Sequence, residues 1–230
     1  MAARRAKLGA VVELSWHGDV AVVSMGDDEN RFDDDAVARW HGLLDEVEAR
    51  EGPVALVTTA SGRFYSNGLD LDWMAASPDR SGPMIRDLHR LWGRVLGFGG
   101  VTVAAVNGHA FGAGALLSAA HDRIVMREDR GWWCMPEVDL GLPVGPDMAM
   151  LLSERLPAAA VHQALVTGHR FTGPEAVAAG IAAETAPEAD VLPRALEWAA
   201  GLLGKDGTII AAHKRTLHGP AIDRLLDIGG

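Results

Sequence analysis

The stretch A-V-N-G-H-A-F-G-A-G, residues Ala105 to Gly114, decides the fold class, because an apolar strand runs directly into a glycine-rich turn that opens a helix. The first amides of a helix have no partner inside the helix, and the helix dipole favours negative charge there. This geometry suits an oxygen atom on which negative charge develops. Two other interpretations are close backbone packing, which needs small residues, and a nucleotide-binding loop. The second is disfavoured, because both the G-K-[ST] ending of a P-loop and the Rossmann glycine spacing are missing.

Strand and helix patterns alternate on either side of this stretch. Short apolar runs predict buried strands, and apolar residues at helical spacing predict helices between them. The predicted strands are Val11 to Trp16, Val20 to Met25, Pro53 to Thr59, Val101 to Val106 and Arg123 to Met126. The predicted helices are one capped by Asp33 or Asp34 with Val37, Trp40, Leu44 and Val47 inward, one over Met84 to Phe98, and one that begins at Gly112. Helical patterns dominate from Asp147 onward, so we expect an α/β sheet with crossover helices and a mostly helical tail.

A second segment, Gly62 to Leu71, follows a predicted strand and contains the pair Asn67-Gly68. An Asn-Gly pair favours a tight turn with positive φ. Such a turn can aim consecutive backbone N–H groups outward, where a carbonyl oxygen could accept them. Because Asn-Gly turns are common, an ordinary strand-to-helix loop is the alternative interpretation.

A third segment, Met135 to Pro143, places two acids, Glu137 and Asp139, among apolar residues. A carboxylate in an apolar wall has a raised pKa and can move a proton near neutral pH. The alternative is that either acid is a solvated loop charge or a helix cap. If residues 135–140 are extended, both side chains point to the same face, and the two like charges raise one of the two pKa values.

Composition limits the function classes. The chain has 230 residues, 48% of them hydrophobic, and a net charge of −10, which argues against a surface that coats nucleic acid. The single cysteine, Cys134, excludes an intrachain disulfide and favours a reducing, cytoplasmic location. No apolar run approaches the roughly 20 residues of a membrane span, and we expect no membrane contact. The histidines lack the spacing of metal ligands, so we predict no metal.

Five pieces in order resemble the enoyl-CoA hydratase/isomerase (crotonase) family over Val11 to Leu217. They are R-F-Y-S-N-G-L-D-L from Arg63, A-V-N-G-H-A-F-G-A-G from Ala105, H-D-R-I-V from His121, P-E-V-D-L-G from Pro136 and T-G-H-R-F-T-G-P-E-A from Thr167. The resemblance implies a repeated ββα spiral core over residues 1–185. It also implies a helical C-terminal region over residues 186–230 that drives assembly into a homotrimer or a dimer of trimers.

The resemblance also implies a site. It assigns the two donors that hold a thioester oxygen to the backbone N–H groups of Leu69 and Ala113, and the acid/base group to Glu137. Hydratases of the family have a second glutamate at the position of Leu116, so its replacement favours a Δ3,Δ2-enoyl-CoA isomerase with one carboxylate. Asp139 is the alternative base. No cofactor is expected, since coenzyme A is part of the acyl-CoA substrate.

Further residues are predicted to contact the substrate by their place in these segments. Arg63 and Lys214 are candidates for the coenzyme A phosphates, and Trp73 and Trp92 for the walls of the acyl pocket. The full set of predicted substrate contacts is Arg63, Asn67, Gly68, Asp70, Gly112, Gly114, Leu116 and Lys214. The alternative functions are another acyl-CoA enzyme of this fold, namely a hydratase, decarboxylase or hydrolase, and an acyl-CoA-binding subunit with a decayed site.

Overall fold

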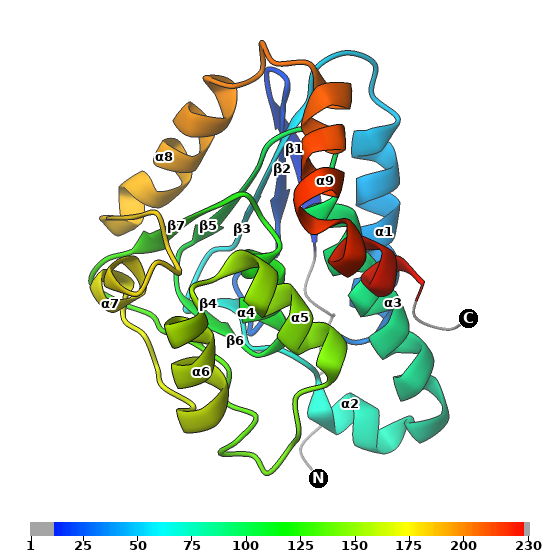
Figure 1. Cartoon of the computed structure of the whole chain (residues 1–230), viewed down its shortest axis with the longest axis vertical. Coiled ribbons are helices and arrows are strands. Elements are labelled where there is room, and N and C mark those ends of the chain that lie inside the picture. The colour runs from blue at the N-terminus through cyan, green and yellow to red at the C-terminus, as the bar shows by residue number, and fades with distance from the viewer. Residues whose placement is uncertain (1–11, 228–230) are drawn as a thin grey trace, which may run out of the picture.

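The computed structural model describes residues 12–227, which form two sheets with helices around them (Figure 1). The six-stranded sheet has the order β1-β2-β3-β5-β7-β9, and the three-stranded sheet has the order β4-β6-β8. Only the β1–β2 pair is antiparallel within these two sheets. The strands are β1 (Glu13–His17), β2 (Val20–Ser24), β3 (Ala55–Thr59), β4 (Phe64–Ser66), β5 (Thr102–Val106), β6 (His109–Phe111), β7 (Arg123–Arg127), β8 (Trp133–Cys134) and β9 (Glu184–Ala186).

The central architecture is a strand–strand–helix unit that occurs three times along the chain. In each unit the first strand joins the large sheet and the second joins the small sheet, as in the pairs β3/β4, β5/β6 and β7/β8. The helices that follow are α2 (Leu71–Ala76) and α3 (Pro78–Leu96), then α4 (Ala113–Ala119), then α5 (Pro146–Arg155). The predicted repeated ββα core is confirmed, and it places the ends of three parallel strands side by side.

Both faces of the large sheet are covered, which explains the continuous apolar runs in its strands. On one face, residues such as Val22, Val57 and Val103 pack with helix α8 (Glu188–Ala200). On the other face, alternate residues such as Leu56 and Ala104 belong to the main core together with the helices of the repeats. Figure 1 shows α8 on one side of the sheet and α3 on the other.

The predicted helices are present, with shifted ends. Helix α1 (Asp34–Glu48) begins where the Asp33 carboxylate accepts a hydrogen bond from the Ala36 N–H at 2.8 Å, and it buries the four predicted residues. Helix α3 begins at Pro78, earlier than predicted, because a proline fits the first turn of a helix. The first predicted strand begins at Val11, which lies outside the described residues.

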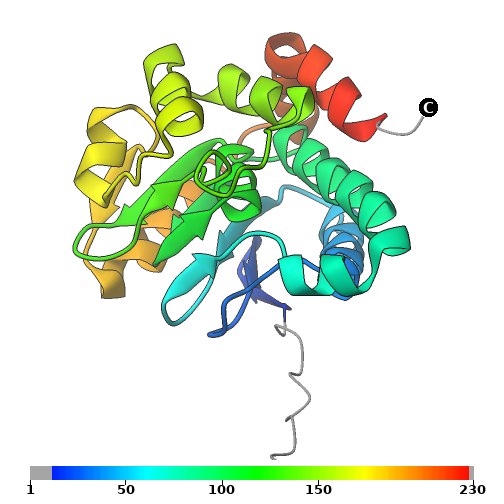
Figure 2. The same ribbon diagram turned by 90° about the horizontal axis from the view of Figure 1, so that it is seen from below.

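The segment after Asp147 is largely helical, as predicted, with α6 (Ala158–Thr167), α7 (Gly173–Ala178), α8 and α9 (Gly207–Leu226). Strand β9 was missed, because three residues are too few for an alternating pattern; it extends the large sheet next to β7. Helix α9 packs on α3, where Gly93 lets Leu225 approach closely (Figure 2). None of the helices in residues 12–227 is long and apolar enough to cross a membrane.

Candidate active site

Three loops meet at the carboxyl edge of the small sheet. Strands β4, β6 and β8 are parallel, so the segments that follow them emerge at the same edge. The segment after β4 holds Gly68 and Leu69, the segment after β6 holds Gly112 and Ala113, and the segment after β8 holds Glu137. The structure therefore gathers the three chemically distinctive segments of the sequence into one place.

The Asn67-Gly68 pair forms the predicted tight turn. Gly68 has a φ of +83°, and a Cβ there would lie 2.9 Å from the Phe111 carbonyl oxygen and 3.6 Å from the Ala113 nitrogen. A side chain at this position would push the two loops apart. Glycine thus permits both the left-handed backbone and the close approach that brings Leu69 beside Ala113.

Hydrogen bonds of Ser66 and Asn30 stabilise this turn. The buried Ser66 hydroxyl donates to the Asn30 carbonyl at 2.7 Å and accepts from the Gly68 N–H at 3.2 Å. Asn30 has a φ of +51°, and its amide donates to the Phe64 carbonyl at 3.0 Å. The sequence patterns did not predict a positioning role for either residue. Both are positioning residues, whose partners lie some 35 residues away along the chain.

Two backbone N–H groups at this edge are free. Within residues 12–227, neither the Leu69 N–H nor the Ala113 N–H donates a hydrogen bond to a protein atom. Ala113 is the first residue of α4, so its N–H has no partner inside the helix. Two free donors at one edge of the small sheet, of which the Ala113 N–H is at a helix start, can stabilise a developing oxyanion.

The glycine at position 114 lets α4 approach β4 this closely. A Cβ on Gly114 would lie 2.6 Å from the Ser66 Cβ and 2.8 Å from the Ser66 carbonyl oxygen, closer than side chains tolerate. Gly112, one residue before Ala113, has a φ of +50° and donates its N–H to the Cys134 carbonyl at 3.0 Å. These contacts fix the start of α4 between the other two loops.

Glu137 reaches the same place from the third loop. A Cβ on Gly112 would lie 3.0 Å from the Glu137 Oε1 atom, so the carboxylate rests against the backbone just before Ala113. The Oε2 atom is buried and has no hydrogen-bond partner in the described part of the chain. Burial raises the pKa of the Glu137 carboxyl above its ordinary value, against a smaller lowering by its own backbone N–H. A carboxylate in this environment is suited to accept and return a proton.

Asp139 does not share this environment. Residues 137–141 form a turn rather than an extended segment, with the Asp139 N–H donating to the Pro136 carbonyl at 3.0 Å. An extended segment, the condition under which both acids would point to one face, is therefore not present. Asp139 is exposed, and its Oδ2 lies near Gly168, where a Cβ would come within 3.0 Å of it.

Three other predicted substrate contacts, Leu116, Asp70 and Asn67, have different environments. Leu116 is buried in α4, three residues after Ala113, so the position holds no ionisable group. Asp70 caps α2 by accepting from the Trp73 N–H at 3.0 Å. The Asn67 N–H donates to the Glu29 carbonyl at 2.8 Å. Of the two predicted acyl-pocket residues, Trp73 is partly buried, and Trp92 is fully buried and stacks on His89.

Arg63 and Lys214, the two residues predicted to contact phosphate, differ in their exposure to solvent. Arg63 is exposed and precedes β4. Lys214 is buried in α9, where its ammonium pairs with the Asp122 carboxylate at 2.8 Å and donates to the Gly100 carbonyl at 2.9 Å. The prediction that Lys214 contacts coenzyme A is therefore corrected. Its side chain is buried, and its charge is already paired with Asp122.

The sequence model described as "Enoyl-CoA hydratase/isomerase" matches residues 17–227, which is nearly the whole described chain. The chain belongs to the enoyl-CoA hydratase/isomerase family. It is 32% identical to enoyl-CoA delta isomerase 3 of Arabidopsis thaliana over 228 residues, covering 94% of each chain. It is also 34% identical to the carnitinyl-CoA dehydratase of Escherichia coli K12 over 173 residues, covering 70% of this chain and 61% of the relative.

Solved structures agree with this membership of the hydratase/isomerase family. An apo structure named as the Mtb enoyl-CoA isomerase superposes with a TM-score of 0.85 at 28% identity, covering 93% of each chain. The human mitochondrial Δ3,Δ2-enoyl-CoA isomerase superposes with a TM-score of 0.86 at 23% identity, covering 94% of this chain and 86% of that one, which shows the shared fold. The crotonase fold and the closeness to the Δ3,Δ2-enoyl-CoA isomerases, both expected from the motifs, are confirmed.

Proposed function

We propose that the protein is a Δ3,Δ2-enoyl-CoA isomerase in which Glu137 is the only acid/base group. The observation that carries the proposal is the placement of one partly buried carboxylate against Gly112, beside the free N–H groups of Leu69 and Ala113. Leu116 supports it, because a buried leucine at the position of the hydratases' second glutamate cannot activate water. The similarity to isomerases over 94% of the chain points the same way.

The reaction would proceed in two proton transfers. Glu137, ionised, removes a proton from C2 of a 3-enoyl-CoA thioester, and the C–H electron pair moves toward the carbonyl to give a dienolate. The N–H groups of Leu69 and Ala113 donate to the enolate oxygen and stabilise its charge. Glu137 then returns the proton to C4, the carbonyl re-forms, and the double bond lies between C2 and C3. No atom is gained or lost, so we propose that no cofactor takes part.

The alternative is a hydratase or another acyl-CoA enzyme of this fold, which the similarity to a relative named carnitinyl-CoA dehydratase favours. Hydration needs one group to activate water and usually another to manage the proton on the α-carbon. Because Asp139 is turned away and Leu116 is apolar, the second group would have to come from elsewhere.

Product analysis separates the two functions. The purified protein is incubated with 3-hexenoyl-CoA and, separately, with crotonyl-CoA, and the products are identified by chromatography and mass. The proposal predicts conversion of 3-hexenoyl-CoA to 2-hexenoyl-CoA without gain of mass and little hydration of crotonyl-CoA. Hydration of crotonyl-CoA at a comparable rate would overturn the isomerase assignment. Binding of both thioesters without turnover would instead indicate a decayed acyl-CoA-binding subunit.

We also propose that the protein assembles as a homotrimer or a dimer of trimers through its helical C-terminal region. Light scattering coupled to size-exclusion chromatography tests this directly, since a monomeric mass would contradict it. A cytoplasmic location stays a prediction, because two of the relatives are named peroxisomal.

A further inference from the structure

Residues 29–32 lie beside the turn that follows β4 and share its hydrogen bonds. Among the described strands, β4 is the edge strand of the small sheet and pairs only with β6. The turn after β4 has a further neighbour, because the Asn67 N–H donates to the Glu29 carbonyl at 2.8 Å. Phe32 then forms a parallel bridge with Leu69. The segment between β2 and α1 therefore extends the small sheet alongside the turn.

This bridge determines the direction of the Leu69 N–H. The Phe32 N–H donates to the Gly68 carbonyl at 2.8 Å, and the Asp70 N–H donates to the Phe32 carbonyl at 2.9 Å. In a parallel pair, the residue that lies between two such bonded neighbours directs its own N–H and C=O groups to the opposite side. Leu69 is that residue, so its N–H points away from residues 29–32.

Ser66 occupies the one remaining N–H group of the turn. The Gly68 N–H donates to the Ser66 hydroxyl at 3.2 Å, and this hydroxyl donates to the Asn30 carbonyl at 2.7 Å. Of the four consecutive N–H groups of residues 67–70, only that of Leu69 lacks an acceptor in the described part of the chain. The neighbouring segment and Ser66 thus leave a single free donor in the turn.

Asn30 determines the path of this segment. Its φ is +51°, and among the described residues no other side chain except hydrogen of glycine stands on a left-handed backbone. Its buried amide donates to the Phe64 and Tyr65 carbonyls of β4 at 3.0 and 3.3 Å. Asparagine enters this backbone region more readily than most residues, because its short polar side chain can form local hydrogen bonds. Such conformations persist where the surrounding structure holds them, and they cluster at functional sites.

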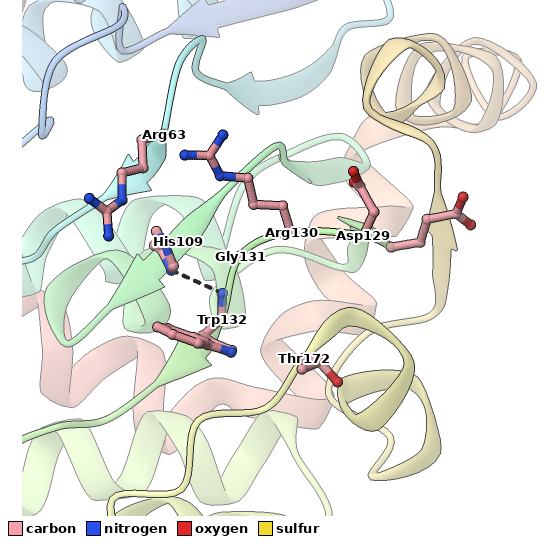
Figure 3. Close-up of a pocket in the computed structure, with 8 residues that line it drawn as sticks. Arg63, His109, Asp129, Arg130, Gly131, Trp132 and Thr172 are labelled. Atoms are coloured by element: carbon pink, nitrogen blue, oxygen red, sulfur yellow. Dashed lines mark hydrogen bonds between the residues drawn. The ribbon is translucent and has the colours of Figure 1, made fainter.

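Strand β6 holds the start of β4, around the pocket that Figure 3 shows. The His109 N–H donates to the Arg63 carbonyl at 3.1 Å, and the rings of His109 and Phe64 lie 5.2 Å apart between their centres. Figure 3 shows a further link, in which the Trp132 N–H donates to the His109 Nδ1 atom at 3.2 Å. Because β4 is held at its start by β6 and at its end by residues 29–32, the turn that follows has one defined orientation.

We propose that residues 29–32 select Leu69 as the only donor of the turn, and that Asn30 and Ser66 fix the direction in which its N–H points. This inference rests on the proposed function, in which that N–H donates to the thioester oxygen. Both side chains are buried, so they act through the backbone rather than by contact with the substrate. Donors stabilise a developing charge best when they are oriented before the reaction. A loosened turn should therefore lower kcat more than it raises KM.

Two substitutions loosen the turn in different ways. Ser66→Ala removes the hydroxyl and keeps the Cβ atom that lies against Gly114. Asn30→Gly keeps access to the left-handed backbone and removes the amide that bonds to β4. The matched control is Ser118→Ala, which removes a buried, hydrogen-bonded hydroxyl from α4. Urea denaturation of each full-length variant sets the conditions under which all of them are folded.

Turnover of 3-hexenoyl-CoA by the folded variants gives the first measurement. We expect Ser66→Ala and Asn30→Gly to lower kcat by about tenfold or more, while KM changes by less than about twofold. Ser118→Ala should keep the kcat of the wild type, even if it destabilises the fold as much as Ser66→Ala does. Equal falls of kcat in Ser66→Ala and Ser118→Ala would overturn the proposal, because they would reflect a general loss of packing.

The carbonyl stretch of bound hexanoyl-CoA, isotope-labelled at its thioester carbonyl, gives a second measurement that needs no turnover. Hydrogen bonds to the carbonyl oxygen lower its infrared frequency, so we expect a lowered frequency in the wild type and in Ser118→Ala. The shift should be smaller in Ser66→Ala and Asn30→Gly. A wild-type shift that both variants retain in full would overturn the positioning role. Bound hexanoyl-CoA without any shift in the wild type would instead contradict the proposed function itself, since no donor would then hold the thioester oxygen.

Discussion

The Glu137 carboxylate lies against the backbone of Gly112, so close that a Cβ on this glycine would come within 3.0 Å of Oε1. Gly112 immediately precedes Ala113, whose free N–H is one of the two proposed oxyanion donors. The proposed acid/base group and the proposed oxyanion donor therefore lie close together, because the residue between them has no side chain. A proton acceptor and an oxyanion donor placed in this way can act on the α-carbon and on the carbonyl oxygen of one thioester.

This contact predicts that Gly112→Ala inactivates the enzyme without unfolding it. The substitution places a methyl group against Glu137 in a left-handed backbone, so we expect kcat/KM to fall about 100-fold and the free energy of unfolding to fall by about 1–2 kcal/mol. Gly42→Ala is the matched control, because Gly42 lies within α1 with open space around it. It should keep full activity and gain about 1 kcal/mol. Equal activity of the two variants would contradict the arrangement.

The pH dependence of the reaction should report Glu137. The base must be ionised to take the C2 proton, and burial raises its pKa above the ordinary glutamate value. We therefore predict that kcat/KM falls as the pH drops, with a midpoint above that ordinary value. Asp139→Asn should leave the midpoint unchanged, since Asp139 is exposed and its carboxylate lies near Gly168. A midpoint that moves in Asp139→Asn would identify Asp139 as the titrating base.

Lys214→Met tests the structural role of this lysine. The substitution leaves the Asp122 carboxylate without its partner at 2.8 Å and the Gly100 carbonyl without its donor, so we expect a loss of about 3 kcal/mol. The KM for acyl-CoA, measured well below the melting temperature of the variant, should not change. Lys205→Met, which removes an exposed lysine, is the control for charge. A severalfold rise in KM with an unchanged melting temperature would restore Lys214 as a substrate contact.

A buried hydrogen-bond chain predicts acid sensitivity of the fold. His121 Nδ1 donates to the Leu117 carbonyl at 2.8 Å, so Nε2 accepts from the Thr58 hydroxyl at 3.0 Å, and that hydroxyl accepts from Tyr65 at 2.7 Å. Burial lowers the pKa of His121 to about 4.

Between about pH 6.5 and pH 4 the unfolded chain therefore takes up a proton that the folded chain refuses. The free energy of unfolding should fall with decreasing pH by about 1.4 kcal/mol per unit in this window. Urea denaturation at several pH values measures the slope. His121→Gln should flatten it, and an unchanged slope in this variant would rule out His121 as the cause.

Local sequence patterns were sufficient to predict the three segments that meet at the candidate site. The turn at Asn67-Gly68, the glycine-rich helix start at Gly112 and the carboxylate at Glu137 each carry a recognisable signal. The ββα order of strands and helices brings their ends to one edge of a sheet. The local pattern is sufficient here, because parallel strands expose the segments that follow them together.

The parts that sequence missed depend on contacts between distant residues. Asn30 and Ser66 support the turn at Asn67-Gly68 through a hydrogen bond between residues 36 positions apart in the sequence. No local pattern predicts such a contact. The backbone after Pro136 forms a turn that exposes Asp139. The sequence of these residues does not distinguish this turn from an extended segment. Lys214 was predicted to contact coenzyme A, yet it pairs with Asp122, which lies 92 residues earlier in the chain, the difference between 214 and 122.

The most direct test of the account is the conversion of 3-hexenoyl-CoA by the wild type, Glu137→Gln and Asp139→Asn, followed by the absorbance of the conjugated 2-enoyl product. The account predicts turnover by the wild type, a loss of about 100-fold to 10,000-fold in Glu137→Gln, and a rate close to wild type in Asp139→Asn. An unaffected Glu137→Gln, or a loss confined to Asp139→Asn, would contradict Glu137 as the single base.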